Sequence, residues 1–330
     1  MSWHYKQEAK GGHGRRTWLA LCLVVVLSLS SGGFYYYTTA RSNQVGSKYL
    51  ESSKTSALPP KPVKPTLKQT LPWPAYGQSA YGTLGYGVLA VSDSQAPQVP
   101  IASLAKTITA LAILQKKPLK LGEQGPTITI TTADVAMYNE YLSKSGSVTK
   151  VSAGQQITQY NAMQAMLLAS ANNLADSLAI WGFGSIEAYT DYANTMVRKM
   201  GLKNTTVADS SGFSPLTVST AEDMTRIAIA YMKKPVLQEI TMQSGAVIPG
   251  TGIIESRNSV YNTAEEFGVK TGNTDQAGRC FIAATIKNNK PYSVAVVLGG
   301  DSVEGVTQAN HLVLRSGNLA VEQDIKTAVK

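Results

Sequence analysis

Two pairs of a serine and a lysine could perform nucleophilic chemistry without a histidine. Ser103 and Lys106 occur in SLAK, and Ser147 and Lys150 occur in SVTK. Residues three apart on a helix share a face, so a hydroxyl and an amine at this spacing can meet. The first pair opens a segment with helical spacing of apolar residues, whereas the second lies in a stretch rich in Ser, Thr and Gly. We therefore favour Ser103 as nucleophile, at a helix start where backbone N–H groups stabilise an anion.

The scarcity of histidine and cysteine argues against the commoner hydrolytic chemistries. Only His311 follows the first 16 residues, in a segment that resembles an amphipathic helix, so a Ser-His-Asp triad has one candidate base. Such a histidine is more often a surface or core-edge residue. Two cysteines, Cys22 and Cys280, cannot form a disulfide framework, and with one histidine they cannot complete a zinc site. We expect no metal and no cofactor.

Two further short motifs follow the first pair along the chain. SAN at 170–172 is weak as a pattern, because SRN at 256–258 and SGN at 316–318 match it equally well. It differs by lying between two apolar helical segments, where a turn can present a hydroxyl and an amide. KTG occurs once, at 270–272, at the end of a predicted strand where glycine lets a substrate backbone approach closely. A lysine can serve as a base only if burial or another cation lowers its pKa, and Lys270 is a candidate for that second cation.

Periodicity predicts the elements that must position these residues. A strand is expected at 85–92, and the later β-branched runs predict an antiparallel meander of strands at 266–272, 278–287 and 291–299. Helices are expected at 103–117, 159–168, 172–180, 185–200, 220–232 and roughly 306–329, the last with Gly317 as a candidate break. Ser219 followed by Glu222 predicts a capping box for the helix at 220–232. The fold class expected is an α/β (α+β) sandwich, an antiparallel sheet flanked by helices with an inserted all-helical subdomain.

The net charge of +9 belongs to the N-terminal segment. Residues 1–68 carry ten Lys or Arg against two acids, whereas residues 69–330 carry twenty against nineteen. The folded part is therefore almost neutral, and we expect no nucleic-acid partner. The basic tail instead suits membrane topology and attraction to an anionic envelope.

Four segments are predicted along the chain. Residues 1–16 form a cytoplasmic tail, and 17–40, uncharged and strongly apolar, form a transmembrane signal-anchor. A cleaved signal peptide, which would leave a secreted protein, is the alternative. Residues 41–74, rich in Pro, Lys and Ser, form a linker that could reach on the order of 100 Å. The domain at 75–330 would then lie outside the cytoplasm of a bacterial cell, tethered by one pass through its membrane.

The stretch from about Tyr81 to Leu314 resembles the low-molecular-weight D-alanyl-D-alanine carboxypeptidases, which are penicillin-binding proteins. The three motifs occur in that family's order. The segments PIASLAKTITALAIL, VSAGQQITQYNAMQAMLLASANNLADSLA, GLKNTTVADSSGFSP and FGVKTGNTDQAGRCFIAATIK also match it in order and spacing. The resemblance implies a β-lactamase/transpeptidase-like fold and removal of the terminal D-alanine from peptidoglycan stem peptides. It also implies β-lactams as covalent inhibitors and no cofactor.

The resemblance assigns the reacting groups. Ser103 would form the acyl-enzyme, and Lys106 would be the base that accepts its proton. Ser170 would pass that proton to the leaving D-alanine. The backbone N–H groups of Ser103 and Asn273 would form the oxyanion hole.

The same resemblance assigns the groups that hold the substrate. Asn172 would hold the substrate amide, and Lys270 would supply field and orientation. Thr271 would contact the terminal carboxylate. Gly272 and Asn273 complete the substrate-binding set.

Departures from the family pattern leave other activities open. Asn273 follows KTG where the family usually has a larger or aromatic residue, and no basic residue lies between Gly300 and His311, near the expected substrate carboxylate. A DD-endopeptidase acting on cross-linked peptidoglycan is therefore the main alternative. A β-lactamase is less favoured, because no ExxLN sequence lies between residues 172 and 270. A non-catalytic β-lactam-sensing module is disfavoured by the intact serine and lysines of the motifs.

Overall fold

The computed structural model describes residues 64–67, 70–258, 262–263, 265–288 and 290–328. The predicted cytoplasmic tail and the predicted signal-anchor at 17–40 lie outside the described residues. Within the described ranges, no helix combines the length and apolar character that a bilayer crossing needs. The last part of the predicted linker belongs to the folded unit, because Leu71 is buried in one cluster with residues of the C-terminal helix such as Val313.

The described residues form a five-stranded antiparallel sheet in the order β2-β1-β11-β10-β9. The meander at its end was predicted, but β1 was not: its sequence QSAYGT shows no strand pattern, yet all its residues are buried. The outer edge of β9 is partly capped, because Gly268 N donates to Asn262 Oδ1 at 3.0 Å. The strands are β1 Gln78–Thr83, β2 Gly87–Val91, β9 Glu266–Thr274, β10 Gly278–Lys287 and β11 Lys290–Gly300.

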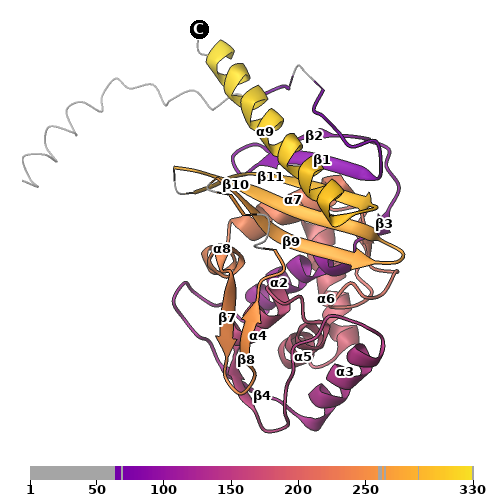
Figure 1. Cartoon of the computed structure of the whole chain (residues 1–330), viewed down its shortest axis with the longest axis vertical. Helices are drawn as coiled ribbons and strands as arrows, with labels where there is room; N and C mark the ends of the chain where they lie inside the picture. Colours follow the sequence, from indigo (N-terminus) through magenta and orange to yellow (C-terminus); the bar gives the residue numbers. More distant parts are fainter. Residues whose placement is uncertain (1–63, 68–69, 259–261, 264, 289, 329–330) are drawn as a thin grey trace, which may run out of the picture. The chain divides into compact units, whose positions relative to one another are not determined.

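Helices pack on both faces of this sheet (Figure 1). Helix α9 (Val303–Ala328) buries Val313 and Val321 against the face that carries Tyr81 and Phe281. Gly317 does not break α9 as expected; a Cβ there would lie 2.5 Å from the Tyr81 ring, so glycine instead allows close packing. Fully burying one such apolar side chain contributes about 1.5–3 kcal/mol.

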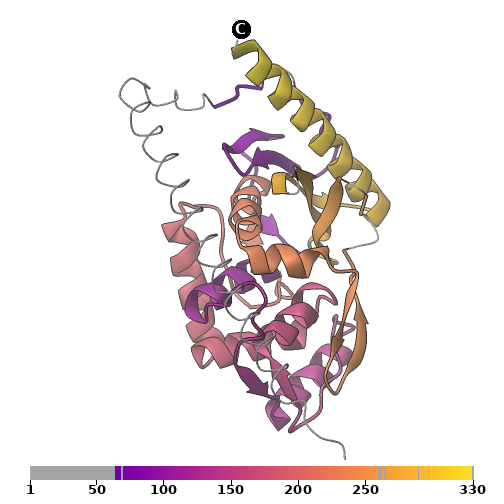
Figure 2. The same cartoon turned by 90° about the vertical axis from the view of Figure 1, so that its left-hand side faces the viewer.

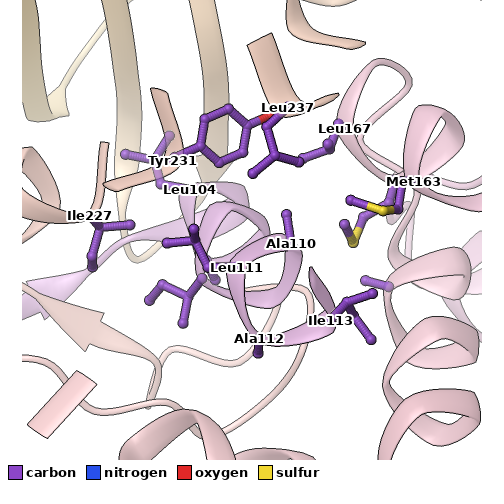
Figure 3. Packing of buried hydrophobic residues seen from close by; sticks show 14 of the residues in the cluster. Leu104, Ala110, Leu111, Ala112, Ile113, Met163, Leu167, Ile227, Tyr231 and Leu237 are labelled. Carbon is purple, nitrogen blue, oxygen red and sulfur yellow. The ribbon is translucent and has the colours of Figure 1, made fainter. Parts of the chain in front are cut away.

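Helix α2 (Ala105–Lys116) lies at the centre of the second core, on the other face of the sheet (Figure 3). Its residues from Ala105 to Leu114 are all buried, which explains why it is apolar on every side. Figure 3 places Ile227 and Tyr231, from α7 (Ala221–Met232), and Met163 around it. Packing therefore fixes the position of Ala105, the first residue of α2.

The segment between β2 and β9 forms the inserted subdomain, which the prediction described as all-helical. Its described residues also contain three two-stranded sheets, β3–β6, β4–β5 and β7–β8, which the prediction missed. The further bounds are η1 Ala102–Leu104, α3 Thr132–Ser143, α4 Gln159–Leu167, α5 Asn172–Phe183, α6 Ile186–Lys199, α8 Pro235–Met242, β3 Val99–Pro100, β4 Thr127–Thr129, β5 Gln156–Thr158, β6 Val218–Ser219, β7 Gly245–Ile248 and β8 Gly252–Glu255.

The predicted cap of α7 was wrong by one residue. Thr220, not Ser219, is the N-cap, and its hydroxyl accepts from Asp223 N. Ser219 instead ends β6 and lies within hydrogen-bond distance of the Thr205 hydroxyl, at 2.8 Å. Ser219, which fits the capping-box pattern in the sequence, is therefore a strand residue in the structure.

Candidate active site

The three motifs meet at one cavity of about 330 Å³. Ser103 lies in η1 at the start of α2, Ser170 and Asn172 lie where α4 passes into α5, and KTG lies in β9. The predicted residues that line the cavity are Ser103, Ser170, Asn172, Thr271, Gly272 and Asn273. The other two, Lys106 and Lys270, are fully buried and reach toward the serines of the site.

The Lys106 amine is held by three oxygens. Its Nζ lies 2.8 Å from Ser103 Oγ, 2.7 Å from Asn172 Oδ1 and 2.8 Å from the Ser211 carbonyl. The amide and carbonyl oxygens can only accept hydrogen bonds. A neutral amine has two N–H bonds and one lone pair, so when both N–H bonds are used on these acceptors the lone pair faces the Ser103 hydroxyl. This geometry suits proton transfer from serine to lysine.

Burial is the main cause that lowers the pKa of Lys106, from 10.5 to about 7. The charges of Asp209 and Asp176 oppose this shift, and the charge of Arg257 adds to it. The sequence left burial and a second cation, Lys270, as possible causes; burial is the larger effect, and the cation that adds to it is Arg257. An amine with a pKa near 7 is neutral in a large fraction of molecules near neutral pH, as a general base requires.

Lys270 binds the second serine of the site. Its Nζ donates to Ser170 Oγ at 3.0 Å and to the Thr271 carbonyl at 2.8 Å. Burial, followed by the charges of Lys106 and Arg257, lowers the pKa of Lys270 well below its ordinary value. Ser170 itself is 3% exposed and has a φ of 61°, a left-handed conformation that is uncommon for serine. The turn between the helices therefore holds its hydroxyl against Lys270.

Close backbone contacts fix the position of Ser103. Ala102, directly before it, has a φ of 46°, which is uncommon for a residue with a side chain. A Cβ on Gly212 would lie 1.8 Å from the Ala102 carbonyl oxygen, so only glycine fits there. A Cβ on Gly272 would lie 3.2 Å from Ser103 N. The glycine of KTG thus lets β9 approach the start of α2, a role that the sequence analysis did not predict.

Two aspartates, the buried Asp176 and the partly buried Asp209, support the loop that carries Gly212. Asp209 accepts from the backbone N–H groups of Phe213 and Ser214, at 2.9 and 3.3 Å. Asp176 accepts from the hydroxyls of Ser210 and Tyr141, and burial raises its pKa. Sequence reasoning missed both residues. Part of the signal lay in the DSSGFSP segment, which matched the family but received no role.

The motif SRN at 256–258, dismissed as a chance match, supports KTG. Asn258 is fully buried, and its Oδ1 accepts from both Thr271 N at 3.0 Å and Thr271 Oγ1 at 3.1 Å. Asn258 also donates to the Leu167 carbonyl at the end of α4. The other match behaves differently, because Asn318 on α9 accepts from the Tyr81 hydroxyl. Only the three-dimensional structure separates these motifs.

Sequence reasoning also missed two cations of the cavity. Arg257 and Arg279 both line it, and Arg257 donates to Ser147 Oγ at 2.9 Å. Among the described lining residues there is no carboxylate, so the cavity favours an anionic ligand. His311 does not line it; His311 contacts Glu266, which also accepts from Arg315 at 3.0 Å.

Comparison with known proteins shows the family of the chain. A family model described as D-alanyl-D-alanine carboxypeptidase matches residues 87–302. A D-alanyl-D-alanine endopeptidase of Pseudomonas aeruginosa is 28% identical over 253 residues, 74% of this chain and 77% of that protein. The endopeptidase of Escherichia coli is 29% identical, over 60% of this chain and 63% of that protein. The E. coli carboxypeptidase DacA is 27% identical, and the match spans about half of its length, 54%.

Solved structures agree with the fold. The Streptomyces K15 DD-transpeptidase has a TM-score of 0.66 at 19% identity, covering 76% of this chain and 100% of that one. A D-alanyl-D-alanine carboxypeptidase of Mycobacterium tuberculosis has a TM-score of 0.65 at 24% identity, covering 77% of this chain and 96% of that one. The expected β-lactamase/transpeptidase-like fold is thereby confirmed.

Proposed function

This chain belongs to the D-alanyl-D-alanine carboxypeptidase family and is a serine-type peptidase, and we propose that it removes the terminal D-alanine of peptidoglycan stem peptides through an acyl-enzyme on Ser103. The observation that carries the proposal is the Lys106 amine, whose Nζ lies 2.8 Å from Ser103 Oγ and whose two other partners can only accept hydrogen bonds. A buried lysine with a lowered pKa does here what a histidine does in other serine peptidases.

Acylation would proceed by proton transfer within the cavity. Lys106 takes the Ser103 proton while Oγ attacks the carbonyl carbon of the penultimate D-alanine. The oxyanion is held by the backbone N–H groups of Ser103 and Asn273. As the C–N bond breaks, the Ser170 hydroxyl gives its proton to the leaving amine and regains one from Lys106. Lys270, hydrogen-bonded to Ser170, favours that transfer.

In deacylation, Lys106 would again act as the base. Water attacks the ester carbonyl, its proton passes to Lys106, and the Ser103–acyl bond breaks as Oγ is reprotonated. No carboxylate occurs among the described residues that line the cavity. A glutamate-activated water, as in some β-lactamases, has no support here, so slow hydrolysis of a penicillin adduct is expected.

Substrate binding would use the remaining motif residues. Asn172 Oδ1 is engaged by Lys106, which leaves the side-chain N–H groups of Asn172 for a substrate carbonyl. Thr271 would contact the terminal carboxylate, with Gly272 and Asn273 beside it. β-Lactams, which present a carboxylate and a reactive amide, would bind in the same way and acylate Ser103.

A second activity, cleavage of cross-links as a DD-endopeptidase, is favoured by one specific observation. Two relatives that share 28% and 29% of their aligned residues with this chain are named D-alanyl-D-alanine endopeptidases. The purified protein should be given a pentapeptide ending in D-Ala-D-Ala and, separately, a cross-linked peptide dimer. Release of D-alanine from the first supports the carboxypeptidase proposal. Cleavage of only the dimer would replace it with the endopeptidase, and failure on both would end it.

Arg279 is expected to bind the terminal carboxylate of the substrate. The sequence offered no basic residue for this carboxylate between Gly300 and His311. It is the cross-strand partner of Asn273, directly after KTG, and in the described part of the chain no carboxylate forms an ion pair with it. We expect Arg279→Gln to lower kcat/KM for the pentapeptide about tenfold, mainly through KM, because a charge-assisted hydrogen bond is worth about 1.5–3 kcal/mol. The same substitution should lower kcat/KM only slightly for the same peptide with a C-terminal amide. The exposed Arg198→Gln serves as control; equal losses on both peptides would contradict the assignment.

We further propose that residues 17–40 anchor the enzyme to the cell membrane, with the domain outside the cytoplasm. The basic residues before this apolar segment and the extracytoplasmic substrate of the family support this topology. In fractionated cells the protein should stay with membranes in high salt and dissolve only in detergent. Release by salt, with a mature N-terminus near residue 41, would show a cleaved signal peptide instead.

A further inference from the structure

The second SxxK motif, at 147–150, connects the catalytic cavity to another hollow. Ser147 and Lys150 do not share a helix face, because the segment is extended and not helical. Ser147 lines the catalytic cavity, whereas Val148, Thr149 and Lys150 line a neighbouring groove of about 580 Å³. We define this groove by residues 148–150, Ala169 and 251–257, except for 252, which is not part of its lining.

The groove is continuous with the catalytic site. Arg257 lines both hollows, and Ala169 in the groove directly precedes Ser170 in the cavity. The remaining wall is β8 and the turn before it, part of the β7–β8 hairpin, which both views show beside the helices of the inserted subdomain (Figures 1 and 2). A chain that leaves the cavity past Arg257 and Ser170 therefore enters the groove.

The walls of the groove are held in place by hydrogen bonds. Thr149 N donates to Asn173 Oδ1 at 3.1 Å, and Asn173 Nδ2 donates to the Thr149 carbonyl at 2.9 Å. The hairpin is tied to the same strip, because Thr251 Oγ1 donates to the Lys150 carbonyl at 2.9 Å. Gln155 adds a bond to the Pro249 carbonyl at 2.6 Å. The groove is thus formed before any ligand enters.

The chemistry of the walls suits a short acidic peptide with small aliphatic side chains. Lys150 and Arg257 supply two cations against one carboxylate, that of Glu255. Ile253 is 80% exposed and, with its cross-strand partner Val247 at 69%, gives the hairpin an apolar face. In the floor, the Thr149 hydroxyl is buried without a hydrogen-bond partner in the described part of the chain. A stem peptide, rich in alanine and carrying free carboxylates, matches these groups.

We propose that this groove binds the second peptide arm of a cross-linked peptidoglycan substrate, an inference that rests on the second proposed activity, cleavage of cross-links. A cross-link joins two stem peptides at the bond that would be cleaved. The catalytic cavity, at about 330 Å³, lies at the lower end of the volumes of ligand sites and accommodates the reacting end of one arm. The other arm needs a further site, and the groove is the hollow continuous with the cavity that carries complementary charge.

The test is binding by the full-length Ser103→Ala protein, which cannot form the acyl-enzyme. Affinities for a cross-linked peptide dimer and for a single stem peptide are measured by calorimetry. We expect the dimer to bind at least about tenfold more tightly, because the second arm binds at high effective concentration. Lys150→Glu and Ile253→Asp, both at exposed positions, should each remove most of this preference. Lys203→Glu makes the same charge change outside both hollows and should keep it.

Three outcomes would overturn the proposal that the groove binds the second peptide arm. These are equal affinity for dimer and single peptide, equal loss on both ligands in Lys150→Glu, or an unchanged preference in both groove variants. Failure of the activity on which the groove depends would appear elsewhere, as absent cleavage of the cross-linked dimer and absent penicillin labelling with Ser103 intact. The two failures can therefore be told apart.

Discussion

Ser103→Ala is expected to abolish covalent labelling by penicillin and to lower D-alanine release by roughly a million-fold, the scale seen when a serine peptidase loses its nucleophile. The substitution removes one oxygen from a partly buried site and leaves Lys106 with its bonds to Asn172 and Ser211. The fold should therefore persist. The measurement is mass spectrometry of the intact protein after incubation with penicillin, together with a thermal unfolding curve.

The second SxxK motif provides a matched control. Ser147 also lines the cavity, but its hydroxyl faces Arg257 instead of a lysine amine. Ser147→Ala should still form the adduct, and the peptide that carries it should contain Ser103. An adduct in Ser103→Ala, or its loss in Ser147→Ala alone, would transfer the nucleophile to the other motif.

Lys106→Ala is expected to slow acylation by about a thousand-fold, within the range that general base catalysis contributes. The amine must be neutral to accept the serine proton. Because its pKa is about 7, the wild-type rate should rise with pH through 7 and then level off. Below that pH, each unit should lower the rate about tenfold, since the neutral fraction of the amine falls by about that factor. Stopped-flow measurement of fluorescent penicillin binding from pH 5 to 9 gives both quantities.

The pH profile separates a catalytic role from a structural one. Lys106→Ala leaves the oxygens of Asn172 and Ser211 without their amine and is expected to lower stability as well as rate. A protein that is only less stable would keep the midpoint near pH 7, whereas loss of the base removes it. Lys150→Ala is the control, because penicillin has no second peptide arm. A near-normal rate in Lys106→Ala would place the base on another residue.

The sequence predicted what depends on local periodicity and short motifs. Helices around the SxxK serine, the meander and the residues of three motifs were all anticipated. Strand β1 escaped because QSAYGT is buried in the interior of a sheet with both faces covered, where polar residues are paired by distant partners such as Asn318. Helix α3 carried a readable signal that was overlooked, a capping box from Thr131 to Asp134.

The parts of the site that sequence could not supply are long-range contacts. Arg257 and Arg279 reach the cavity from β8's end and from β10, so a search for a cation only after β11 could not find them. Asn258 supports Thr271 across 13 positions, and Ser147 meets Arg257 across 110. No local pattern distinguishes these residues from the chance matches around them, because their function arises from the pairing of segments.

The two asparagine side chains that contact the edge of β9 also bear on self-association. An edge strand exposes a row of peptide groups that can pair with any extended chain, including another copy of the protein. Here Asn262 and Asn258 occupy the outer N–H groups of Gly268 and Thr271. The stretch beyond Thr271 is where the substrate is proposed to lie. Removing either asparagine would therefore lengthen the unpaired edge of β9. We expect such variants to aggregate during refolding even where the folded protein still binds its substrate.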